Sequence, residues 1–209
     1  MATFDLDEQE QLDAIKQFWR SYGNIIVAVV LAVVIGFGGT KWWQHKNTTA
    51  AQSASAAFNK IETAEADGEA MRSLTDALIS EHGATYYADL ARLNAAKIAS
   101  ENSDYEQAIT ELQAVVKNDR DSSLVALAKL RLAALHLITE QYDDAMSALD
   151  GDAEASMSGL FADMRGDIYA AQSLNDEALA SYQEALSRLR PGNPWMDIVQ
   201  IKIDSLGSQ

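Results

Sequence analysis

The chain's longest hydrophobic pattern is an uncharged run near the N-terminus. Twenty residues without a formal charge extend from Ser21 to Thr40, between Arg20 and Lys41. In a helix this run would cover about 30 Å, the thickness of a bilayer's hydrocarbon core. Aromatic residues of the kind that sit in the headgroup layers flank it at both ends: Trp19, Tyr22, Trp42 and Trp43. We therefore predict an N-terminal tail over residues 1–20 and a single transmembrane helix over 21–43.

Other interpretations of the run explain less. It is too long for a β-strand, and a buried helix of a soluble protein needs no aromatic and charged residues at its ends. A signal peptide should begin with a basic segment, whereas this tail carries five acidic residues before Lys16. Two basic residues precede the run and two follow it, so the positive-inside rule leaves the direction of crossing open.

Small residues recur at every fourth position within the run. They form one stripe along the predicted helix, consisting of Ala28, Ala32, Gly36 and Thr40. Such a stripe allows a second membrane helix to approach closely. The alternative is the ordinary abundance of alanine and glycine in membrane helices, and the sequence leaves both open.

After residue 50 the pattern changes to amphipathic helices. Between residues 175 and 189 the apolar positions recur at i, i+1, i+4, i+7, i+8 and i+11, which is one helical face. Glycine and Asn/Asp clusters interrupt the pattern repeatedly, and both prolines, Pro191 and Pro194, lie near the C-terminus. The segment 122–138 is apolar on nearly all sides, so it is either packed between neighbours or leaves an apolar face for a partner. The fold class predicted is all-α.

Three segments repeat one small-residue and aromatic pattern. Ala108, Ala145 and Ala178 are 37 and 33 residues apart, and each lies close to a tyrosine. This pattern is typical of tetratricopeptide repeats, in which small residues let two helices of a hairpin approach. We predict a tetratricopeptide-like domain over residues 44–209, with hairpins at about 48–82, 86–118, 122–152 and 157–190 and a capping helix at 194–206.

Composition and charge limit the classes of function that the chain could have. The chain has no cysteine and a net charge of −15, of which about −14 follows residue 46, so binding to nucleic acid is disfavoured. The three histidines share no metal-ligand spacing with carboxylates, and no nucleophile elbow or phosphate-binding loop is present. We expect no enzyme activity, no metal and no cofactor.

Five short segments share their order and spacing with a known family: residues 10–19, 39–43, 53–58, 162–166 and 200–206. On these segments the chain resembles the YfgM-type ancillary subunits of the bacterial Sec translocon over essentially its whole length. The resemblance implies a single-pass protein of the bacterial inner membrane, with a cytoplasmic N-terminal tail and a periplasmic repeat domain. It also implies four kinds of partner: the SecYEG translocon, a membrane-anchored prolyl-isomerase-like periplasmic chaperone, translocating client proteins and a cytoplasmic response regulator.

Two functions follow from this resemblance. The first is a protein-binding scaffold that links protein export to the periplasmic chaperone network. The second is a membrane-tethered adaptor that regulates a stress-response regulator through the tail, where Leu12, Ile15 and Phe18 or Trp19 lie on one helical face.

Repeat proteins of this class bind partners along the concave face made by the first helix of each hairpin. The repeat register places six apolar residues on or near that face: Leu90, Leu93, Leu127, Leu130, Leu137 and Ile138. The alternative for each of them is a place in the ordinary core.

Overall fold

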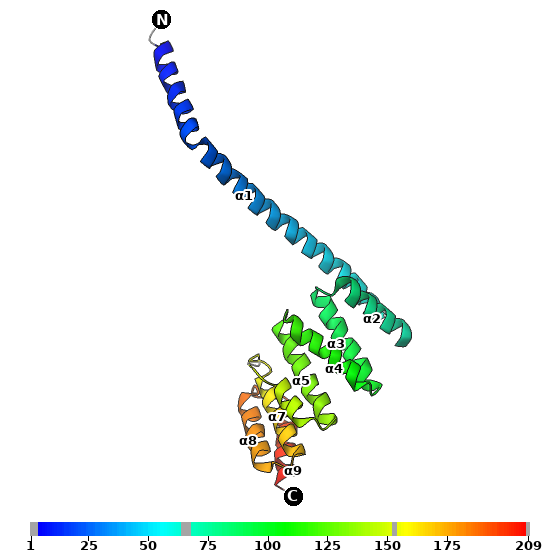
Figure 1. Ribbon diagram of the computed structural model, residues 1–209. Helices are drawn as coiled ribbons and strands as arrows, with labels where there is room; N and C mark the ends of the chain where they lie inside the picture. The colour runs from blue at the N-terminus through cyan, green and yellow to red at the C-terminus, as the bar shows by residue number, and fades with distance from the viewer. Residues whose placement is uncertain (1–3, 64–67, 152–153, 208–209) are drawn as a thin grey trace. The chain divides into compact units, whose positions relative to one another are not determined.

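A computed structural model describes residues 4–63, 68–151 and 154–207, and Figure 1 shows these residues as helices without strands. The all-α prediction is therefore confirmed. The chain divides into two compact units, residues 1–52 and 53–209. The described helices are α1 Phe4–Thr63, α2 Gly68–His82, α3 Tyr86–Glu101, α4 Tyr105–Asn118, α5 Ser122–Ile138, α6 Tyr142–Ala148, α7 Ser158–Ala171, α8 Asn175–Arg188 and α9 Trp195–Leu206.

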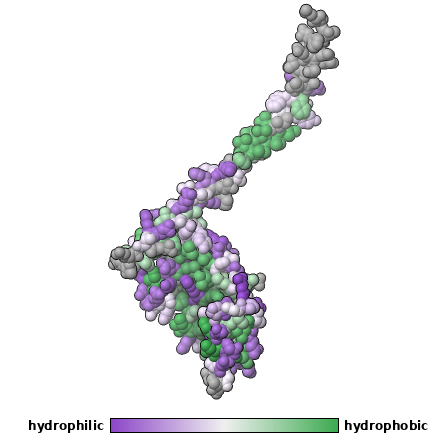
Figure 2. All heavy atoms as spheres, turned by 180° about the vertical axis from the view of Figure 1, so that it is seen from behind, coloured by the Kyte–Doolittle hydropathy of each residue, from purple (hydrophilic) through white to green (hydrophobic). Residues whose placement is uncertain are grey.

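The described part of the first unit belongs to one helix, which has an exposed apolar surface. Among the described residues, α1 is the only helix long and apolar enough to cross a membrane. Figure 2 shows this segment as an apolar band between more polar stretches. Large side chains in the band are open to their surroundings, as with Ile35 and Phe37 at 69% and 66% exposure. By length and composition, α1 is suited to a bilayer.

The second unit is a series of helical hairpins joined by short turns (Figure 1). The pairs are α3 with α4, α5 with α6, and α7 with α8, and α9 packs against α8. The predicted first hairpin corresponds to the last part of α1 and to α2, and residues 64–67 between them lie outside the described residues. Ile61 and Leu78, each 1% exposed, form a cluster there with residues of α3.

The turns inside the three later hairpins have the same backbone geometry. Each contains one non-glycine residue with positive φ: Ser103 at 60°, Glu140 at 59° and Ser173 at 62°. The next residue donates its backbone N–H to the carbonyl five positions earlier, over 2.8, 2.8 and 2.9 Å. These are the bonds that end a helix in a left-handed residue. The three positions have the same 37- and 33-residue spacing as the repeated alanines.

Packing inside each hairpin depends on small residues in that register. Ala108, Ala145 and Ala178 are fully buried. A second small position on the first helix pairs with a larger residue 16 positions later, and its three occurrences are Ala96 with Leu112, Ala133 with Leu149, and Gly166 with Tyr182. A Cβ atom on Gly166 would clash with the Tyr182 ring. The larger ring therefore requires the smaller partner.

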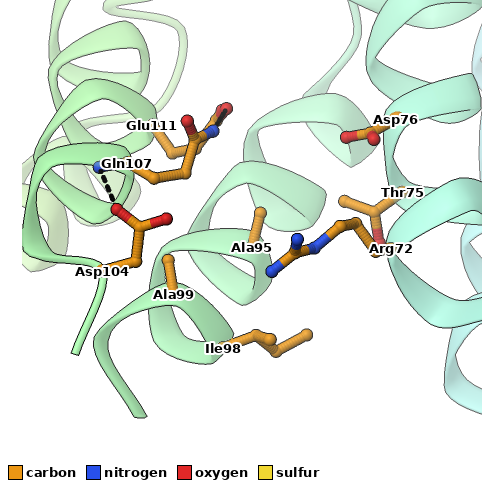
Figure 3. A pocket seen from close by; sticks show the side chains of 9 residues that line it. All are labelled: Arg72, Thr75, Asp76, Ala95, Ile98, Ala99, Asp104, Gln107 and Glu111. Carbon is orange, nitrogen blue, oxygen red and sulfur yellow. Dashed lines mark hydrogen bonds between the residues drawn. The ribbon is translucent and has the colours of Figure 1, made fainter. Parts of the chain in front are cut away.

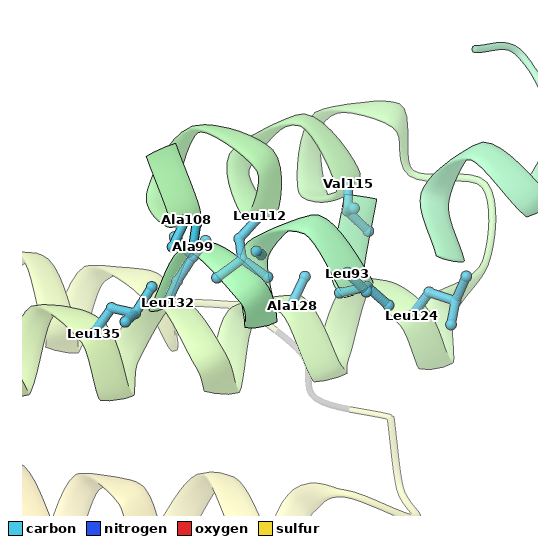
Figure 4. Close-up of a cluster of buried hydrophobic side chains, with 10 residues drawn as sticks. Leu93, Ala99, Ala108, Leu112, Val115, Leu124, Ala128, Leu132 and Leu135 are labelled. Carbon is cyan, nitrogen blue, oxygen red and sulfur yellow. The ribbon is translucent and has the colours of Figure 1, made fainter. Parts of the chain in front are cut away.

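The apolar helix α5 lies between two core clusters. One face contributes Leu124, Ala128, Leu132 and Leu135 to the cluster with α3 and α4, shown in Figure 4. The other contributes Ala126 and Ala133 to the cluster with α6 and α7. Packing on both sides explains why 122–138 is apolar nearly all round. Its partner α6 has only seven residues, and Gly151, with a φ of 87°, follows its end.

Candidate protein-binding surface

A groove lies between α3 and α5, the first helices of two successive hairpins. Its cavity has a volume of about 360 Å³. Small side chains on both helices leave room for the groove. Its apolar floor consists of Ala96, Leu112, Ala134 and Leu135, and Ile138 lines its edge. Ile138 is 59% exposed at the end of α5. A large apolar side chain held open beside an apolar floor is suited to contact an apolar segment of another protein.

Charged side chains form the rim of this groove. Lys97 and Glu101 pair across one helical turn at 3.8 Å, with 63% of each side chain exposed, so the pair adds little stability. Arg131 donates from Nη1 to the backbone carbonyl of Leu93 over 3.1 Å. That bond links α5 to α3 and holds one positive charge at the edge of the apolar floor.

The six residues predicted for the concave face lie in different environments. Leu93 is 5% exposed and belongs to the first core cluster, against which Leu90 and Leu127 also pack. Leu130 and Leu137 pack against the second cluster. Ile138 alone of the six lines the groove and is exposed. The groove also contains Ala96 and Ala134, which the sequence interpretation did not place on the concave face although their small size was the available signal.

The four stripe residues of α1, Ala28, Ala32, Gly36 and Thr40, are all exposed. A Cβ on Gly36 would have no neighbour within 4 Å, and the Thr40 hydroxyl donates to the Phe37 carbonyl over 2.9 Å. Thr40 is thus satisfied within the helix, and the stripe presents small groups outward. Docking at the stripe stays a prediction.

The proposed regulatory face of the tail is only partly described. The side chains of Leu12 and Ile15 lie outside the described residues. Phe18 and Trp19 are 55% and 58% exposed, and the rings of Phe18 and Tyr22 are 5.2 Å apart. The role of the tail as a binding segment therefore stays a prediction.

A polar pocket of about 260 Å³ lies among α2, α3 and α4, and Figure 3 shows Arg72 and Asp76 facing Asp104 and Glu111 across it. Glu111 accepts hydrogen bonds from Arg92 at 2.7 Å and from Gln107 at 2.9 Å. Asp104 caps α4 by accepting from the Gln107 backbone N–H over 3.2 Å. Two of the pocket's carboxylates thus hold α4 in place.

Asp89 is a buried carboxylate, 2% exposed, in the first of the complete hairpins. Arg120 donates to both of its oxygens over 2.9 and 2.8 Å, and Asn118 donates to one over 2.7 Å. Arg120 also donates to the carbonyl of Gly83 over 2.9 Å. One carboxylate therefore joins α3 to the end of α4 and to the turn before α3.

Asp163 is a buried carboxylate in the last hairpin, 4% exposed. It accepts from Trp195 Nε1 and Lys202 Nζ of α9, each over 2.8 Å. Lys202 also pairs with Asp167, which accepts from the Tyr182 hydroxyl over 2.8 Å. Burial, this hydrogen bond and the negative charges of Asp167 and Asp163 raise the pKa of Tyr182 above its ordinary value of 10.0. These bonds fasten α9 across the last hairpin.

None of these arrangements resembles a catalytic centre. In the described part of the chain, no three His, Asp or Glu side chains group in a way that could hold a metal ion. The His136 ring forms a hydrogen bond with Gln141, with Nδ1 and Oε1 2.8 Å apart, so this histidine has a structural partner. The charged networks connect helices, and the groove between α3 and α5 is open to solvent.

Comparison with known proteins agrees with this architecture. Residues 16–208 match the family model of the tetratricopeptide repeat-like domain. The protein named ancillary SecYEG translocon subunit in Neisseria gonorrhoeae is 33% identical over 205 residues, covering 96% of this chain and 98% of that protein. Its namesake in Haemophilus influenzae is 28% identical over 183 residues, covering 87% and 90%. The namesake in Escherichia coli is 26% identical over 204 residues, covering 96% and 97%.

No solved structure matches the chain. The family model covers most of the sequence, and the similarity to the neisserial protein extends over nearly the whole of both chains. The chain therefore belongs to the family of tetratricopeptide repeat-like proteins that includes the ancillary SecYEG translocon subunits.

Proposed function

We propose that this protein is an ancillary subunit of the SecYEG translocon in the bacterial inner membrane, where it acts as a scaffold without enzyme activity. In this role it links protein export to the periplasmic chaperone network. Near full-length similarity to proteins of that name supports association with the translocon. The observation that carries the scaffold function is the apolar groove between α3 and α5, with Ile138 exposed beside it.

The chemistry of the groove favours a protein ligand. Burying apolar surface on its floor contributes about 25 cal/mol per Å², while the charged rim selects the orientation of a bound segment. A prolyl-isomerase-like chaperone or a translocating chain would supply such a segment. The net negative charge of the domain disfavours the binding of nucleic acid at the groove.

The groove can be tested in the full chain in native membranes. A photoreactive residue at Ile138 should give adducts with a periplasmic chaperone or a translocating protein, identified by mass. Tyr86, 45% exposed at the start of α3 and not among the groove-lining residues, is the matched control position. Equal adducts from both positions, or none from Ile138, would contradict a binding role for the groove.

We also propose that the stripe on α1 contacts a membrane helix of the translocon. Replacing Gly36 with leucine would fill the space between two close helices and should reduce copurification with SecYEG. Val34→Leu changes a residue on the opposite side of α1 and provides the control. Equal copurification of both variants would exclude the stripe as the contact.

The proposed orientation places the tail in the cytoplasm and the repeat domain in the periplasm. Because the natural chain has no cysteine, single cysteines report their own location without background. In intact spheroplasts, a membrane-impermeant maleimide should label Gln200→Cys, and it should label Gln9→Cys only after lysis. The opposite result would reverse the orientation.

A further inference from the structure

The C-terminal helix α9 packs like the first helix of another hairpin. In α7, Phe161, Met164 and Ile168 pack toward the preceding hairpin at spacings of three and four residues. In α9, Met196, Val199 and Ile203 pack against α8 at the same spacings. The register of α9 is therefore that of α7 plus 35 residues.

This register identifies an uncovered face on α9. In α7, Asp163 is buried against side chains of α9, and Gly166 is buried against Tyr182 of α8, the second helix of the hairpin. Their equivalents in α9 are Ile198 and Ile201, and these are 41% and 68% exposed. No helix in the described residues covers them. The position that faces the second helix in the preceding hairpin is here the exposed Ile201, and Ile198, three residues earlier, extends its apolar surface.

The charges beside this face indicate what would cover it. Asp197 and Asp204 lie on its flank, and the chain has a net charge of −15. A second copy would bring two acidic surfaces together, which is unfavourable. A helix with basic residues along one flank would instead gain from both the apolar face and the acidic flank.

Size matching adds a further property of a helix that would cover this face. Where the small position is alanine, the residue facing it is leucine, and where it is glycine, the residue is tyrosine. In α9 this position is Ile201, which is larger than either alanine or glycine. The facing helix therefore needs a small residue at that point, because close-packed interfaces conserve total volume.

We propose that α9 is a docking helix for a separate protein. The partner supplies an amphipathic helix with a small residue opposite Ile201 and basic residues beside Asp197 and Asp204. This surface is distinct from the groove between α3 and α5, and the proposal does not depend on that groove.

A synthetic peptide provides a defined probe. It contains residues 175–190 of this chain with Tyr182→Ala as the small residue and with Glu177→Lys and Glu184→Lys as basic flank residues. Fluorescence anisotropy with the full-length protein in detergent should show binding that weakens at least tenfold with Ile201→Ser and that also weakens with added salt. The same basic peptide with Tyr182 retained should bind several-fold more weakly, because the ring meets Ile201.

Control variants show whether the loss of peptide affinity is specific to Ile201. Leu174→Ser removes a side chain of similar exposure to Ile198, 40%, from the turn between α7 and α8, and should leave peptide affinity unchanged. Circular dichroism should show that Ile201→Ser leaves the helical content intact. Equal affinity for the natural protein and Ile201→Ser would overturn the proposal. Loss of binding with Ile138→Ser would show that the peptide binds in the groove between α3 and α5 instead, which would also overturn it. Dimerisation of the natural protein that Ile201→Ser abolishes would identify a second copy as the occupant and would also overturn it.

Discussion

The α3–α4 and α7–α8 hairpins have the same turn geometry but differ in the side chains that pack between their helices. Both turn through a left-handed serine, Ser103 or Ser173, with φ values of 60° and 62°. Between their helices, the first uses Ala96 with Leu112 and the second uses Gly166 with Tyr182. The register of the turn and of the small residues is thus constant, while the volume at each contact is divided differently between the two helices.

Their buried carboxylates differ in the same way. Asp89 is neutralised by Arg120, from the segment after its own hairpin, and Asp163 by Lys202 of α9. In each hairpin a buried negative charge is paired with a cation from chain that follows. The comparison indicates that shape is set by the repeated positions and that each hairpin is joined to its surroundings by its own residues.

Removing either cation should have the largest effect on stability. Arg120→Ala leaves Asp89 with Asn118 as its side-chain donor, and we expect a loss of about 3 kcal/mol in the free energy of unfolding. Lys202→Ala should cost a similar amount, because Trp195 still donates to Asp163 as Asn118 does to Asp89. Urea denaturation followed by circular dichroism measures both losses. Lys97→Ala breaks only the exposed pair with Glu101 and serves as the control, with a change below about 0.5 kcal/mol.

The small-to-large pairing should account for the next largest effect. Gly166→Ala places a methyl group against the Tyr182 ring and should destabilise the domain by about 2 kcal/mol. Adding Tyr182→Leu recreates the alanine–leucine pair of the α3–α4 hairpin and should restore much of that loss. Thermal unfolding of the two single variants and the double variant gives the interaction free energy between positions 166 and 182. Purely additive losses would show that the two contacts are not equivalent.

Alkaline pH should distinguish the two hairpins further. The pKa of Tyr182 is raised in the folded chain, so the protonated hydroxyl stabilises the fold fully below pH 10. This stabilisation is lost as the pH rises from 10 through the folded pKa. The free energy of unfolding should therefore begin to fall as the pH rises from 10 to 11. Tyr182→Phe should remove this part of the pH dependence in urea denaturation between pH 8 and 11. An unchanged slope would show that Tyr182 ionises normally.

The turns should show the smallest and most uniform effect. Glycine adopts positive φ without strain, so Ser103→Gly and Ser173→Gly should each stabilise the domain by about 0.5 kcal/mol. The two gains should be equal if the turns are equivalent. Ser100→Gly, inside α3, should instead destabilise by about 0.5–1 kcal/mol, and thermal unfolding measures all three.

The repeat register was readable from the sequence because small buried residues are forced to recur where two helices approach. Ala108, Ala145 and Ala178 satisfy that requirement and are fully buried. The all-α class followed from hydrophobic periodicity for similar reasons.

The candidate surface was less predictable from the sequence. Leu137 and Ile138 are neighbours of similar size, yet one packs against a core cluster and the other is open, because neighbouring helices cover only one of them. Sequence spacing gives the helix face to within one position, whereas exposure depends on how adjacent hairpins are stacked. The links from Asp163 to Trp195 and Lys202 were hidden for the same reason, since they join residues 32 and 39 positions apart.

The fastening of α9 limits the length of ligand that the groove can accept. Asp163 and Asp167 occupy the positions on α7 that correspond to Leu130 and Ala134 on α5, and side chains of α9 already cover them. The open part therefore lies along α3 and α5. With helices spaced by about 10 Å, two helices span about 20 Å, which is an extended segment of roughly six residues. A scaffold of these dimensions would recognise a short sequence within a long chain and leave the rest of that chain free to move on.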